Sequence, residues 1–223
     1  PEEPKPWRRQ RPLVHRPAMT SPVAKQMTQP RERPIIFSGP MVRAILAGTK
    51  TQTRRVIRVH RGLDPEFWEL KLPGVWSCFD TEANDMREIG SPYGSPGDRL
   101  WVRETWAEEE REDGRRDAIL FAADTRPTAY GGRRFNDGSL FYGRWRSPLF
   151  MPRRFSRLTL EITAVRVERL QAISNDDVHA EGFAPWGDKA LRFADTWDAL
   201  NAKRGCGWAK DPWVWAVTFR RIT

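Results

Sequence analysis

The alternation of apolar and polar side chains predicts one long strand in the C-terminal half of the chain. Between residues 157 and 170, apolar residues first occupy even positions and then, from Val165 onward, odd positions. A change of parity within one strand turns the buried side chains to the other face of the sheet. We therefore expect a bulge or sharp bend near residues 163–164. The same alternation predicts a final strand at residues 213–220.

Shorter apolar runs predict further strands, and apolar residues at helical spacing predict three helices. Strands are expected at residues 35–37, 67–72, 75–79, 99–106 and 118–123. Helices are expected at residues 40–47, at residues 175–181 after an N-cap at Ser174, and at residues 189–202. The third helix is expected to bury Leu191, Ala194, Trp197 and Leu200.

This order of elements predicts an α+β, mainly β fold. The expected architecture is a small, partly open β-barrel with short flanking helices and loop insertions. A single domain is expected over residues 33–223, with insertions near residues 58–96 and 107–155. Within the second insertion, residues 126–143 are rich in Gly, Arg, Asn and Asp and are expected to form a mobile loop.

The N-terminal segment differs from the rest of the chain in composition. Residues 1–34 contain eight Lys or Arg, three Glu and eight Pro, so they carry +5 of the formal net charge of +9. Such a segment buries too little apolar surface to offset the entropy that ordering would remove. Residues 1–32 are therefore expected to form a disordered basic arm, which could attract nucleic acid electrostatically.

The remaining composition bears on compartment and cofactors. No window approaches the roughly 20 consecutive apolar residues of a membrane-spanning helix. The two cysteines, Cys78 and Cys206, and the three histidines lack the spacing of a disulfide framework or a metal site. We therefore expect a cytoplasmic protein that uses no metal or cofactor and contacts no membrane. Nothing in the sequence implies an obligate protein partner.

A polar segment at residues 48–55, expected to be a loop after the first helix, carries the strongest candidate chemistry. It holds three cations and three hydroxyls within eight residues. If Lys50 is partly desolvated, the neighbouring charges of Arg54 and Arg55 further disfavour its charged form. Lys50 could then accept a proton from Thr53 and make that hydroxyl a nucleophile. The alternative is an ordinary solvated loop, because charged, hydroxyl-rich loops usually face water.

Four stretches of the sequence together resemble the ASCH domain of the PUA-like superfamily, in its larger phage-associated form. They read AILAGTKTQTRRV, PGDRLWVRETW, RLTLEITAVRVERLQAISNDDVHAEGF and WVWAVTFRRI, and they follow one another in the family's order. The family signature Gly-x-Lys-x-x-Glu-x-Arg falls on Gly48, Lys50, Thr53 and Arg55, with Thr53 in place of the usual Glu. The resemblance extends to bacterial N4-acetylcytidine amidohydrolases, whose catalytic Lys, Thr and Glu match Lys50, Thr53 and Glu181.

The resemblance implies a metal-independent amidohydrolase that acts on N4-acylated cytidine or related cytosine-type nucleosides and bases. In this hypothesis Lys50 accepts a proton, Thr53 attacks the amide carbonyl, and Glu181 protonates the leaving nitrogen. The residues expected to bind substrate are Ser38, Arg54, Arg55, Arg103 and Trp106. The expected partner is a modified pyrimidine nucleoside or RNA. Two alternative functions remain: a noncatalytic RNA-binding module, and a ribonuclease that uses the same basic segment.

Overall fold

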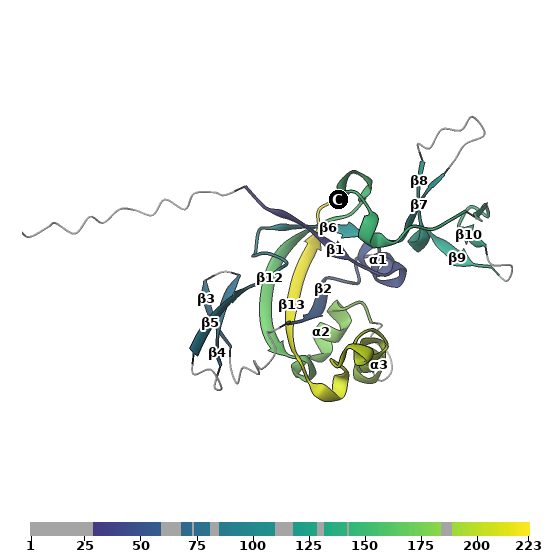
Figure 1. Ribbon diagram of the computed structural model, residues 1–223. Coiled ribbons are helices and arrows are strands. Elements are labelled where there is room, and N and C mark those ends of the chain that lie inside the picture. Colours follow the sequence, from purple (N-terminus) through teal and green to yellow (C-terminus); the bar gives the residue numbers. More distant parts are fainter. Residues whose placement is uncertain are drawn as a thin grey trace, which may run out of the picture.

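A five-stranded sheet forms the centre of the molecule (Figure 1). The computed structural model describes residues 29–58, 68–72, 74–80, 85–109, 118–128, 132–141, 143–183 and 189–223. In spatial order the strands are β1 (Glu32–Ile36), β6 (Arg99–Arg103), β12 (Thr159–Arg169), β13 (Trp213–Arg221) and β2 (Gln52–Val56). Strands β1 and β6 run parallel, whereas the other three pairs are antiparallel.

The predicted α+β, mainly β fold class is confirmed. In the described part of the chain the central sheet is open, with β1 and β2 as its edge strands. The predicted bulge is also confirmed, because the pairing of β12 with β13 changes register between Ile162 and Ala164. Strand β1 begins at Glu32, one residue before the expected start of the domain. Residues 1–28 of the expected basic arm lie outside the described residues.

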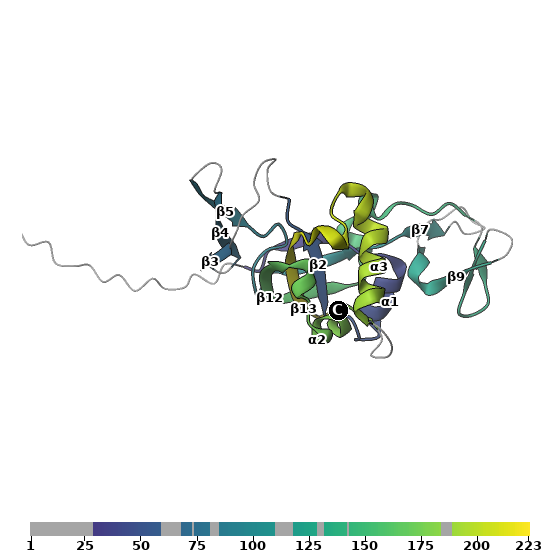
Figure 2. The same cartoon turned by 90° about the horizontal axis from the view of Figure 1, so that it is seen from below.

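Three smaller sheets lie at the two ends of the central sheet (Figures 1 and 2). One contains β3 (Trp68–Leu72), β4 (Val75–Asp80) and β5 (Asp85–Gly90). At the opposite end, β7 (Trp106–Glu109) pairs with β8 (Ala118–Phe121), and a third sheet contains β9 (Thr125–Pro127), β10 (Arg133–Phe135) and β11 (Leu140–Phe141). The strands of each small sheet lie within the chain segments that the sequence marked as insertions.

Two sequence expectations are wrong in this region. Described parts of the expected loop at residues 126–143 form a three-stranded sheet, because β10 pairs with both β9 and β11. The single strand expected at residues 99–106 is divided, since β6 ends at Arg103 and β7 begins at Trp106. Glu104, between them, is buried and accepts hydrogen bonds from the Arg157 guanidinium, so its side chain fixes the break.

The helices are short and cover both faces of the central sheet. They are α1 (Gly39–Leu46), α2 (Asn175–Ala180) and α3 (Lys189–Asn201). Single 3₁₀ turns occupy Ala122–Asp124, Pro148–Phe150, Arg153–Phe155, Leu170–Ala172, Ala202–Arg204 and Trp208–Lys210. No helix among the described residues is long and apolar enough to cross a membrane.

Strand β13 has apolar residues at both parities because each face of the sheet packs on its own cluster. Trp215, Val217 and Phe219 join the larger cluster, which includes Val42 and Ile45 of α1. Val214 points the other way, into a smaller cluster with residues of α2 and α3. Successive side chains of a strand face opposite sides, so a strand covered on both faces is apolar throughout.

Helix α3 buries a narrower stripe than its sequence predicts. Phe193, Ala194 and Trp197 are buried, and their spacing places them on one side of the helix. Leu191 and Leu200 were also expected to be buried, but they are 58% and 53% exposed. Among the described residues of the helix, the buried side chains therefore form one narrow stripe.

The polar segment at residues 48–55 is not the loop that the sequence predicts. Its second half forms β2, which pairs with β13 from Gln52 opposite Thr218 to Val56 opposite Val214. Charged and polar residues dominate this strand, yet Gln52, Thr53 and Arg54 are buried. Side chains from distant segments bond to Gln52 and Arg54, and Thr53 is bonded to Arg55 of the same strand, so these buried polar groups have partners.

Candidate functional site

The main chain holds Lys50 directly against Glu181, although 131 positions separate the two residues. The N–H of Thr51 donates to the carbonyl of Ala180 at 2.8 Å, which ties the start of β2 to the end of α2. Helix α2 ends at Ala180 with Glu181 as its C-cap, and Gly182 follows with a φ of +92°. The N–H groups of Gly182 and Phe183 bond to carbonyls of the last helical turn, a Schellman ending that requires this left-handed glycine. Glu181 is thereby fixed where the chain turns back.

The Lys50 ammonium is buried and has three acceptors. Its Nζ donates to the Glu181 carboxylate oxygen Oε2 at 2.6 Å and to the main-chain carbonyls of Gln52 and Glu181 at 2.7 and 2.9 Å. Burial lowers the pKa of Lys50, and the nearby Arg55 and Arg54 charges add to that effect, whereas the Glu181 carboxylate opposes it. An ammonium has three protons, so this arrangement uses its full hydrogen-bonding capacity.

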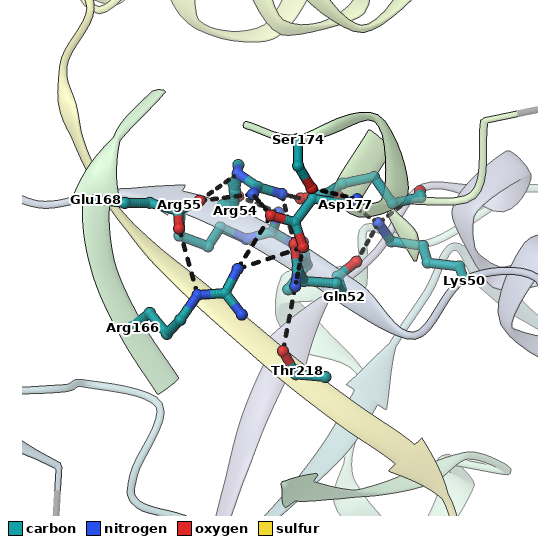
Figure 3. Close-up of polar contacts among 11 residues, drawn as sticks. Lys50, Gln52, Arg54, Arg55, Arg166, Glu168, Ser174, Asp177 and Thr218 are labelled. Atoms are coloured by element: carbon teal, nitrogen blue, oxygen red, sulfur yellow. Dashed lines mark hydrogen bonds and ion pairs between the residues drawn. The ribbon is translucent and has the colours of Figure 1, made fainter. Parts of the chain in front are cut away.

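Arg54 links the Lys50–Glu181 pair to a wider ionic network (Figure 3). Its guanidinium donates to Glu168 at 2.5 and 3.0 Å, to Asp177 at 2.9 Å and to Glu181 at 3.3 Å. A further bond of 2.5 Å runs to the side-chain carbonyl of Gln52. Because Arg54 is buried, these partners supply the compensation that a buried guanidinium requires.

Asp177 is the second carboxylate that stabilises this network. Burial acts to raise the pKa of Asp177, but the hydrogen bond from Gln52 and the charges of Arg54 and Arg166 outweigh burial and lower it. The Arg166 guanidinium donates to Asp177 at 3.1 and 3.3 Å (Figure 3). The N–H of Asp177 also donates to the Ser174 hydroxyl, the expected N-cap of α2. Asp177 therefore remains ionised and anchors α2 to β2.

Thr53 and Arg55 alternate with Gln52 and Arg54 along β2, and they contact each other. The Arg55 guanidinium donates to the Thr53 hydroxyl at 2.8 Å and to the carbonyl of Ile36 at 2.9 Å. Arg55 lies over the Phe37 ring at 5.2 Å, and the Lys50 ammonium lies 5.8 Å from the same ring centroid. Thr53 is 0% exposed. No hydrogen bond joins Lys50 to Thr53 among the described residues.

Arg55 has no carboxylate within 4 Å in the part of the chain that the structure describes. Burial lowers the pKa of Arg55, and the nearby Tyr93 and Glu181 act in the opposite direction. The Tyr93 hydroxyl is affected by the same surroundings, because burial raises its pKa while the Arg55 charge opposes that rise. A poorly compensated guanidinium beside a cavity attracts an anionic or strongly polar ligand group.

A cavity of about 570 Å³ is lined by residues of the edge strand β2, of α1 and of α3. This volume lies within the range of small-molecule sites. Glu181, Arg54 and Arg55 are its inner charged residues, and Arg58 and Arg204 add two exposed cations. Its apolar walls consist mainly of Phe37, Met41, Phe183, Phe193, Trp197 and Leu200. The cavity therefore combines aromatic surface with positive charge and one carboxylate.

The predicted site residues divide between this cavity and other places. Ser38 lines the cavity together with Arg54, Arg55 and Glu181. Lys50 lies behind Glu181 and does not reach the cavity surface. Arg103 and Trp106 are not part of the cavity lining: Arg103 stacks on Trp101 and bonds to the Leu149 carbonyl, and Trp106 packs on Phe155.

Sequence reasoning missed several residues of the site. It expected Trp197 to be buried in the third helix, and it assigned no role in the site to Gln52, Arg166, Glu168 or Asp177. The signal available was the pair of charges Arg166 and Glu168 within the strand expected at residues 157–170, since buried charges require partners of opposite sign. Among the described residues no cluster of three or more His, Cys, Asp or Glu could hold a metal ion.

Comparisons with known proteins add little to this description. No protein-family model matches the chain, and no curated protein matches it. The chain is similar to a solved structure titled "High resolution crystal structure of ASCH domain from Lactobacillus crispatus JV V101", at 13% sequence identity and a TM-score of 0.37. The match covers 86% of this chain and 79% of that chain.

Proposed function

We propose that the cavity binds an N4-acylated cytidine, or a related cytosine-type nucleoside or base, and that the protein hydrolyses its exocyclic amide. The observation that carries the proposal is the buried Lys50–Glu181 contact of 2.6 Å behind a cavity of nucleoside-binding size. The sequence resemblance assigns catalytic roles to the same two residues. A lysine whose pKa is lowered by burial, bonded to a carboxylate that lines a cavity, is an acid–base pair suited to proton transfer.

In the proposed reaction the Thr53 oxygen attacks the amide carbonyl carbon, and its proton passes to the Lys50–Glu181 pair. Glu181 then protonates the departing cytosine nitrogen, which leaves as the free amine. Water hydrolyses the acyl–threonine ester, so the overall products are the carboxylic acid and cytidine. Thr53 is fully buried, is bonded to Arg55 and is not part of the cavity lining, so the proposed reaction requires Arg55 to leave the Thr53 hydroxyl before substrate reaches it.

The test is release of cytidine from N4-acetylcytidine by the purified full-length chain, followed chromatographically. We expect Glu181→Gln and Thr53→Val to lower kcat by about 10² to 10⁴, the usual contribution of a general acid–base group. Glu104→Gln is the matched control, because Glu104 is also a buried carboxylate bonded to an arginine but does not line the cavity. Glu104→Gln should reduce thermal stability and leave kcat unchanged. Absence of cytidine release by the unmodified chain would reject the proposal.

Noncatalytic binding of nucleic acid is the second candidate, and the state of the Thr53 hydroxyl favours it. This hydroxyl is buried and bonded to Arg55, and all three Lys50 protons have acceptors, so the site is organised for binding as it stands. Under this alternative, affinity for RNA falls steeply as the salt concentration rises. Each phosphate contact contributes about one unit to the slope of log affinity against log salt concentration. Binding without turnover, unaffected by Thr53→Val, would establish this function in place of hydrolysis.

A further inference from the structure

A second hollow, separate from the cavity, combines aromatic rings with arginines. It has a volume of about 1140 Å³ and is lined by residues of β7 and β11. Strand β7 lies at the end of the molecule away from β3–β5 (Figure 1). The aromatic lining of the hollow consists of Trp106, Phe141, Trp145, Phe150 and Phe155, and its arginines are Arg144, Arg146 and Arg154. We call this hollow the aromatic groove.

The aromatic groove has a fixed wall. Trp106 and Arg146 form a β-bridge with main-chain hydrogen bonds of 2.7 and 3.4 Å, which holds the segment around Arg146 against β7. The Arg146 guanidinium lies 4.9 Å from the centre of the Trp106 ring and donates to Glu108 at 2.6 Å. Trp106 in turn packs on Phe155 with their ring centres 5.2 Å apart. Trp106 is 2% exposed, so it supports this wall from behind, and the wall is positioned before any ligand binds.

Two arginines and one phenylalanine of the groove are available to a ligand. Phe150 is 77% exposed, more than any other large apolar residue that the structure describes. Arg144 and Arg154 are exposed, and in the described part of the chain neither lies within 4 Å of a carboxylate. Glu108 is neutralised by Arg146, which leaves Glu109 as the other acid in the lining. Exposed rings beside unpaired guanidinium groups match the bases and phosphates of a single strand.

The aromatic groove adjoins the cavity through two pairs of chain neighbours. Thr105 lines the cavity and the next residue, Trp106, lines the groove. Pro148 lines the cavity, whereas Ser147 and Phe150 on either side of it line the groove. The 3₁₀ turn Pro148–Phe150 therefore borders both hollows.

From these observations we infer that the aromatic groove binds single-stranded nucleic acid and presents one of its bases to the cavity. The inference about presentation rests on the proposed function and changes its substrate from a free nucleoside to a nucleoside within a strand. Phe150 stacks on a base next to the one in the cavity, and Arg144 and Arg154 contact the phosphates. Sequence preference should be weak, because every base offers a stacking face.

The test measures fluorescence anisotropy of a labelled single-stranded RNA of about ten nucleotides, a length within the usual site sizes, with the full-length chain. The same sequence as single-stranded DNA, and as a duplex, provides the other arms. Phe150→Ala should weaken single-strand affinity about 5- to 150-fold, the range measured for lost base stacking. Arg154→Ala should reduce the dependence of log affinity on log salt by about one unit. Matched controls are Leu72→Ala and Arg220→Ala, which remove an exposed apolar group and an exposed charge elsewhere.

Tight binding of RNA and DNA single strands alike supports recognition by stacking, and binding of RNA alone supports it with an added contact to the 2′-hydroxyl. The inference is overturned if neither strand binds, if the duplex binds equally well, or if the groove variants match the controls. These anisotropy measurements use unmodified bases, so their result is independent of hydrolysis. If hydrolysis occurs, an oligonucleotide with one N4-acetylcytidine should show a lower KM than the free nucleoside. Phe150→Ala should remove that advantage without changing turnover of the nucleoside.

Discussion

Replacement of Glu181 by Gln tests whether the Lys50–Glu181 pair is a buried ion pair that depends on both partners. Their side chains are 1% and 5% exposed, so the change leaves a buried ammonium with no other carboxylate bonded to it among the described residues. Arg54 is affected less, because it keeps Glu168 and Asp177 as partners. Loss of one partner of a buried pair typically costs about 3–5 kcal/mol. For a chain of this size, that corresponds to a fall in Tm of roughly 6–20 °C.

The surface offers a control with the same geometry. Lys71 and Glu69 of β3 are also 2.6 Å apart, but their side chains are 41% and 55% exposed. Glu69→Gln should therefore cost less than about 1 kcal/mol, because water already compensates both charges. The free energies of unfolding of the two variants and the unmodified chain are compared by urea unfolding. The comparison requires that the slope m be the same for all three proteins.

A double-mutant cycle separates the pair from its surroundings. Lys50→Met removes the ammonium but leaves two buried carbonyl groups without their donor, so it should also destabilise. In the double variant with Glu181→Gln no unpaired charge remains, and the loss should fall short of the sum of the single losses by up to about 3 kcal/mol. Strict additivity, or a Glu181→Gln loss no larger than that of Glu69→Gln, would refute the reasoning.

The Glu181→Gln loss should also depend on pH in a definite direction. Burial lowers the pKa of Lys50 in the folded state, so the unfolded chain binds more protons in the window between that value and the ordinary lysine pKa. Stability then rises with pH through this window. Without Glu181 the folded-state pKa falls further, and the window extends toward neutral pH. The destabilisation caused by Glu181→Gln should therefore diminish as pH rises. A loss of stability independent of pH would contradict the reasoning that the variant leaves a charged Lys50 buried without its carboxylate.

Two further predictions concern residues away from the cavity surface. Arg157→Gln should destabilise by about 3–5 kcal/mol at about pH 8, because it leaves the Glu104 carboxylate buried without its guanidinium partner. Burial already raises the pKa of Glu104, and a raised folded-state pKa removes stability as pH rises, so urea unfolding at about pH 5 should show a smaller loss. Gly182→Ala should cost at least about 1–2 kcal/mol, since a left-handed φ strains an alanine and its Cβ would lie 3.1 Å from side-chain atoms of Ala44 and Lys50. A Tm equal to that of the unmodified chain would contradict this account of the Schellman turn.

The sequence by itself determined the elements whose signals are local. The N-cap at Ser174 predicted the start of α2, and the change of parity near Thr163 predicted the bulge that β12 contains. The same local signals gave the mainly β class, because short alternating runs outnumbered helical stripes. Lys50 and Glu181 were also selected from the sequence, through its resemblance to a family, before their contact was known.

Only the tertiary structure decided where charge and burial coincide. The pattern of β2 is polar, so local propensity predicts a solvated loop, yet Arg54 is buried because Glu168, Asp177 and Glu181 approach it from more than 110 positions away. For the same reason the burial of α3 was overestimated, since the buried side chains among its described residues form one narrow stripe. Whether a polar strand is buried depends on the energies of contacts between distant segments, and no local pattern contains those energies.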